Sequence, residues 1–60
     1  MTSKDKQKIY IIIGQLRGKA SLYPSFENGK FNKENAIYQT GIAEAINMLY
    51  DFLEEENKND

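Results

Sequence analysis

The stretch KENAIYQTGIAEAINMLYDFLEE, from Lys33 to Glu55, decides the fold of this chain. Its apolar residues recur every three or four positions, so at about 100° per residue they share one arc of an α-helix. Asn32 stands where an N-cap residue is preferred, and Glu34 complements the helix dipole in the first turn. The pattern predicts a long helix, whose core-facing residues are Tyr38, Ile42, Ala45, Ile46, Leu49, Phe52 and Leu53.

This helix is more apolar than one neighbouring helix can cover. When Ile37, Met48 and Tyr50 are added to the core-facing arc, the apolar surface extends over more than half of the circumference. A second packing partner is therefore predicted.

The first third of the chain supports two interpretations. As a helix from Lys4 to Gly18, capped by Thr2 or Ser3, it has a core-facing stripe of Ile9, Ile12, Ile13, Leu16 and Ala20. As a strand, residues 9–13 are a β-branched and aromatic run of the kind buried in sheets. Gly14 and Gly18 each disfavour a helix by about 1 kcal/mol relative to alanine. We favour the helix, because the stripe continues through Leu16 and a strand has no evident partner.

The segment between these elements contains Pro24 and the pair Asn28-Gly29, a sequence typical of a type I′ turn. Two structures fit it. One is a loop whose side chains plug the open end of a helical hairpin, and the other is a minimal hairpin of residues 25–26 with 30–31. The expected plugs are Leu22, Tyr23, Phe26 and Phe31.

The fold class that follows is all-α, a single domain over residues 1–60 with a short N-terminal and a long C-terminal helix in an antiparallel hairpin. We expect two hairpins to dimerise into a four-helix arrangement. The alternative is an α+β fold, in which an N-terminal strand or small hairpin packs on the long helix. Residues 57–60 contain no apolar side chain and are expected to fray.

Self-association is predicted from size and helix length. A 60-residue chain without cysteine or histidine has neither disulfides nor a typical zinc site to support its small core. The long helix is also expected to extend past the short one at its C-terminal end, unless residues 4–8 fold over that end as an extended arm. The predicted interface with a second copy, or with a different protein, comprises Ile42, Ile46, Leu49, Phe52 and Leu53.

A second predicted contact surface lies on the opposite side of the N-terminal helix. Gly14 and Gly18 have the spacing that lets two helices approach closely, and Ile11 lies beside them. The alternative is that these glycines end the helix or bend a strand. The same stretch is not a phosphate-binding loop, because three residues separate the glycines and Ala20 follows Lys19.

Charge is sorted along the chain. Residues 1–33 carry seven basic and two acidic side chains, whereas residues 34–60 carry one basic and seven acidic ones. The basic half suggests an alternative function as a nucleic-acid-binding accessory protein, although the pI of 5.3 is low for that class. The candidate phosphate contacts are Lys4, Lys6, Lys8, Arg17 and Lys19.

The sequence therefore predicts a small, non-catalytic protein-protein interaction module. We expect no cofactor, no metal and no small-molecule substrate, because histidine and cysteine are absent and so short a chain has little room for a shielded cleft. The apolar run at residues 9–13 is too short for an export signal or a membrane span, so a cytoplasmic location is expected. The composition is typical of phage and mobile-element proteins, and the specific hypothesis is a modulator or inhibitor of a larger host protein.

Overall fold

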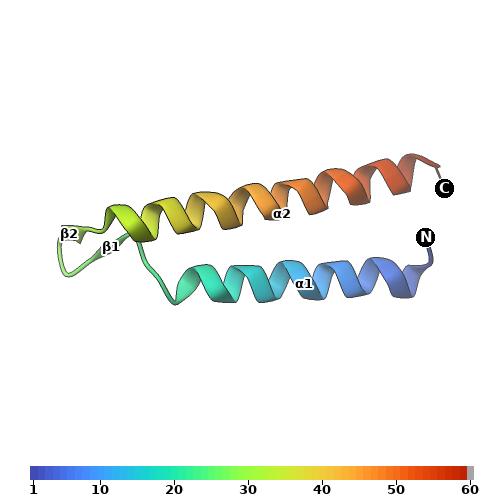
Figure 1. The fold of residues 1–60 in the computed structure, drawn as a ribbon. Helices are drawn as coiled ribbons and strands as arrows, with labels where there is room; N and C mark the ends of the chain where they lie inside the picture. Colours follow the sequence, from blue (N-terminus) through green and yellow to red (C-terminus); the bar gives the residue numbers. More distant parts are fainter. Residues whose placement is uncertain (60) are drawn as a thin grey trace.

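The computed structural model describes residues 1–59 and contains two long helices joined by two short strands. Figure 1 shows the helices antiparallel and side by side, with the chain termini at one end and the strands at the other. The two-helix hairpin is therefore confirmed, and residues 9–13 are helical rather than extended. In chain order the elements are α1 (Ser3–Ser21), β1 (Phe26–Glu27), β2 (Lys30–Phe31) and α2 (Lys33–Asn59).

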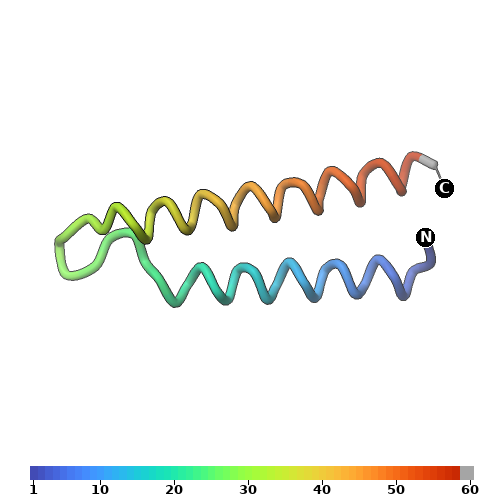
Figure 2. The backbone as a smooth tube through the Cα atoms, viewed as in Figure 1, coloured from blue at the N-terminus to red at the C-terminus, as the bar shows by residue number. Residues whose placement is uncertain are grey.

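The connection between the helices is the small hairpin that the sequence left as an alternative. Asn28 and Gly29 have φ angles of 53° and 75°, the two left-handed conformations that a type I′ turn requires. Phe26 pairs with Phe31 in the antiparallel ladder. Figure 2 shows that the connection runs beyond the start of α2 before it turns back into the helix.

The expected plugging of the hairpin end by apolar side chains is wrong. Leu22, Tyr23, Phe26 and Phe31 are all exposed. Phe26 and Phe31 belong to strands of only two residues each, too short to cover the end of the helices, and Leu22 and Tyr23 lie in the link that follows α1. Tyr23 nevertheless makes an edge contact with Tyr38, with ring centroids 5.1 Å apart.

Polar side chains just before α2 and within it fix the connection in place. Asn32 caps the helix as predicted, because its side-chain oxygen accepts a hydrogen bond from the backbone N–H of Asn35 at 3.0 Å. Two turns further on, the Gln39 amide donates to the carbonyl oxygens of Ala20 and Tyr23 at 3.1 and 2.9 Å. These bonds satisfy carbonyl groups at the C-terminal end of α1 and hold that end level with Gln39.

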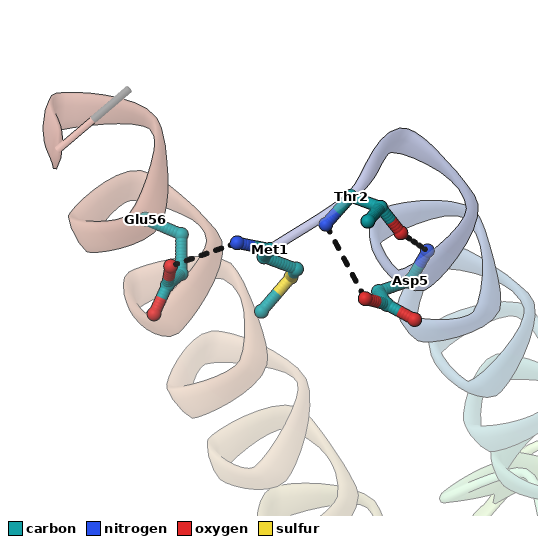
Figure 3. Close-up of polar contacts among 4 residues, drawn as sticks. All are labelled: Met1, Thr2, Asp5 and Glu56. Carbon is teal, nitrogen blue, oxygen red and sulfur yellow. Dashed lines mark hydrogen bonds and ion pairs between the residues drawn. The ribbon is translucent and has the colours of Figure 1, made fainter.

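The first helix begins with a capping box and continues through its two glycines. The hydroxyl oxygen of Thr2 accepts a hydrogen bond from the Asp5 N–H at 3.2 Å, and the Asp5 carboxylate accepts one from the Thr2 N–H at 3.3 Å (Figure 3). Gly14 and Gly18 both lie inside α1, which ends at Ser21. The helix is thus longer at its C-terminal end than the predicted end at Gly18.

We expect the capping box to make the stability of the chain sensitive to acid. The hydrogen bonds of Thr2, first through its side chain and then through its backbone N–H, hold the pKa of Asp5 below its ordinary value of 3.8. Because this pKa is lower in the folded chain than in the unfolded chain, the ionised Asp5 carboxylate stabilises the fold above pH 3.8. That stabilisation is lost as the pH falls through the lowered pKa. Urea unfolding at a series of pH values in this range measures the free energy of unfolding. This free energy should fall less on acidification for Asp5→Asn than for the parent, and equal falls would contradict the role of the capping box.

The core lies along the seam between the helices. Ile13 of α1 and Ile46 and Leu53 of α2 are buried, with exposed fractions of 3%, 9% and 2%. The partly buried residues packed against them are Ile9, Leu16, Ile42 and Leu49. Each of these seven residues belongs to a predicted core-facing stripe.

Three other members of those stripes are exposed. Ile12, Tyr38 and Phe52 retain between about a third and a half of their accessible surface. Ile12 and Phe52 lie at the edges of their stripes, and one facing helix covers only the centre of such a broad arc. Tyr38 lies near the centre of its arc but precedes Gln39, with which the end of α1 is level, so α1 does not reach it.

The C-terminal end of α2 extends beyond the predicted range. Residues 57–59 belong to the helix, and whether they fray in solution stays a prediction. Residue 60, the last of the predicted tail, lies outside the described residues.

Candidate interaction surface

The predicted overhang at the C-terminal end of α2 is wrong. The ammonium group of Met1 lies 3.9 Å from the Glu56 carboxylate, so the start of α1 is level with the last turns of α2 (Figure 3). Leu53, expected to be uncovered, is the most buried residue of the core. Residues 4–8 do cover this end, but as a turn of helix rather than as an extended arm.

The extra length of α2 lies at the hairpin end instead. The C-terminal end of α1 is level with Gln39, so residues 33–38 of α2 extend past it together with β1 and β2 (Figure 2). The cause is the connection, which continues beyond α1 before it reverses. The uncovered part of α2 is therefore its first six residues.

This shift changes the role of most of the predicted interface residues. Ile42, Ile46, Leu49 and Leu53 pack in the seam with α1, so within a single chain they are already covered. Phe52 remains 46% exposed. The sequence-predicted interface is thus divided between an internal core and a free surface.

The glycine face of α1 lies open within the single chain, so its predicted close contact with another helix stays a prediction. A Cβ atom added at Gly14 or Gly18 would meet nothing within 4 Å, and Ile11 beside them is exposed. This face points away from α2, because Ile11 lies about 160° round the helix from the buried Ile13.

A second apolar stripe runs along α2, about a third of the circumference away from its core-facing side. It consists of Ile37, Gly41, Ala45, Met48 and Phe52, which are spaced four, four, three and four positions apart and therefore lie on one face. We name this set the outer stripe. Met48 and Ile37, at 72% and 63%, are among its most exposed members.

The first half of the outer stripe borders an open groove of about 570 Å³. Its walls are largely apolar and include Phe31 of the hairpin and Ile37 of α2. Gly41 leaves room in the groove, because a Cβ atom there would meet nothing within 4 Å. The remaining lining residues are Lys33, Ala36, Thr40 and Glu44.

The predicted phosphate contacts are not gathered on one face. The Arg17 guanidinium donates a hydrogen bond to the Tyr50 hydroxyl at 2.9 Å and lies 5.8 Å from the centre of its ring. Arg17 therefore joins α1 to α2, a role that its sequence position did not indicate. Helix periodicity places Lys6 on the same flank as Arg17, whereas Lys4, Lys8 and Lys19 lie on the other side of α1.

Residues 1–59 contain neither a cluster of metal-ligating side chains nor a membrane-spanning helix. Within residues 1–59, no three acidic side chains converge so as to hold a metal ion. Neither α1 nor α2 has an apolar stretch long enough to cross a lipid bilayer. Comparisons with protein-family models, with curated proteins and with solved structures found no match for this chain.

Proposed function

We propose that this chain is a small, non-catalytic protein-protein interaction module that first binds a second copy of itself through the outer stripe. The supporting observation is the imbalance of its apolar surface. Among the described residues, thirteen large apolar side chains are exposed and only three are buried. Burying one such side chain stabilises a structure by about 1.5–3 kcal/mol, so a partner that covers the outer stripe adds substantially to stability.

The size of the chain supports self-association in the same way. A core of three buried residues is small even for a 60-residue protein, and oligomerisation is a common way to enlarge it. A closed two-fold dimer is the commonest arrangement for soluble homo-oligomers. Two hairpins then form a four-helix assembly with the α2 helices in contact.

Regulation of a larger protein is the second part of the proposal. A dimer formed through the outer stripe leaves Ile11, Gly14 and Gly18 uncovered on α1. These residues offer an apolar side chain beside two positions without side chains, which suits the close approach of a helix from a target protein.

The first test compares two exposed aromatic residues. Replacing Phe52 with glutamate places a charge on the outer stripe, so we expect a monomer with its helices intact. Replacing Tyr10 with glutamate is the matched control, because Tyr10 is 52% exposed and belongs to α1. Sedimentation equilibrium measures the mass, and far-UV circular dichroism checks the helices.

The outcomes separate the proposal from a general effect of charge. A parent dimer that Phe52→Glu dissociates and Tyr10→Glu preserves supports the outer stripe as the interface. A parent chain that remains monomeric at high concentration would contradict self-association, and equal dissociation by both variants would contradict the choice of surface.

A further inference from the structure

We propose that the two copies associate with their α2 helices antiparallel, so that Met48 and Phe52 of each copy fill the groove of the other. This inference rests on the proposed function and adds to it the direction and register of the contact. The groove lies along the first half of α2, and the two projecting side chains lie on the second half of the same stripe. One surface therefore carries both a hollow and the groups that suit it.

The outer stripe is self-complementary about its centre. A two-fold axis close to Ala45 brings residues at equal distances before and after that point together. Gly41 then faces Met48 of the partner subunit, and Ile37 faces Phe52 of the partner subunit. A two-fold interface requires this property, because the same patch must serve both copies.

The sizes of the facing residues agree with this register. Met48 is 72% exposed and Gly41 has open space where its side chain would be. Large residues opposite small ones interdigitate without voids, and a methionine adapts well to an irregular hollow. In a parallel, in-register pair, Gly41 would face another glycine and leave the hollow empty.

The charges at the two ends of α2 favour the same direction. Residues 30–34 have a net charge of +1, from Lys30, Lys33 and Glu34, whereas residues 54–58 have a net charge of −2. Antiparallel helices bring the positive end of one copy to the negative end of the other. Parallel helices would bring like charges together at both ends, and their helix dipoles would also repel.

Cysteine cross-linking tests the direction directly, because the chain has no native cysteine. Gly41→Cys and Met48→Cys are prepared as separate variants and mixed in equal amounts under mild oxidation. Antiparallel packing predicts a disulfide-linked dimer that forms at least about tenfold faster in the mixture than in either variant alone, since only the mixed pair is held at high effective concentration. Within the single α2 helix these positions are about 10 Å apart, too far for a direct bridge.

Gly14→Cys mixed with Met48→Cys is the matched control, because both positions are exposed but lie on different helices and faces. Rapid disulfide formation between that pair would overturn the register. Faster linkage of Gly41→Cys alone would overturn the antiparallel direction in favour of a parallel pair. Slow linkage in every mixture, with a dimer still present in sedimentation, would overturn this inference and leave the proposed function standing. A monomeric parent chain in sedimentation would overturn both.

Discussion

Replacing Leu53 with alanine is expected to leave most of the chain unfolded at 25 °C. Leu53 is 2% exposed and belongs to a core with only two other buried residues. Removing a buried leucine side chain costs about 2–5 kcal/mol, from lost burial and from the cavity that remains. A single core in a chain of this length rarely supplies more than about 3–5 kcal/mol, so the loss is comparable to the whole stability.

Leu22→Ala provides a control with the same chemical change. Leu22 is 71% exposed and lies just after α1, outside the seam and the outer stripe. Urea unfolding followed by far-UV circular dichroism at low protein concentration should give a parent-like midpoint for Leu22→Ala and little remaining helix for Leu53→Ala. Similar midpoints for the two variants would contradict the placement of Leu53 in the core.

The helices themselves were predictable from sequence because their signals are local. The spacing of apolar residues in α2, the Asn32 cap and the capping residue Thr2 each act within one or two turns. The same holds for the Asn28-Gly29 turn, although the sequence alone did not decide between a loop and a hairpin.

The alignment of the helices was not predictable, because long-range contacts determine it. The Gln39 side chain bonds to carbonyl groups of residues 16 and 19 positions away, and the hairpin carries the chain past the start of α2. This displacement moved the uncovered part of α2 from its end to its beginning. Leu49 and Leu53 were consequently assigned to a free surface although they pack against α1.

The candidate site was predictable only in part for the same reason. Periodicity identified α2 as too apolar for one neighbour, and it placed Ile37 and Met48 in the excess. It gave no sign of the groove beside Phe31, because that groove forms only where the folded hairpin brings Phe31 near the first turns of α2. The Arg17 bond to Tyr50 joins residues 33 positions apart and has no sequence signal either.

The melting temperature of the parent chain is expected to rise by roughly 10 °C or more with protein concentration. This rise refers to an increase from a concentration near the Kd of the dimer to one a hundred times higher. Association stabilises the folded state by about 2 kcal/mol over this range, because only the folded chain presents the outer stripe. In a domain of this length, 1 kcal/mol shifts the melting temperature by about 4–8 °C.

The Phe52→Glu variant separates this coupling from other effects of concentration. Its seam residues are unchanged, so its melting temperature should equal that of the dilute parent and stay constant as concentration rises. Thermal unfolding followed by circular dichroism over a wide concentration series measures both chains. A parent melting temperature that does not depend on concentration would mean that the exposed side chains of the outer stripe stay in water. Among the described residues, the seam around Ile13, Ile46 and Leu53 would then supply the apolar core that supports the fold.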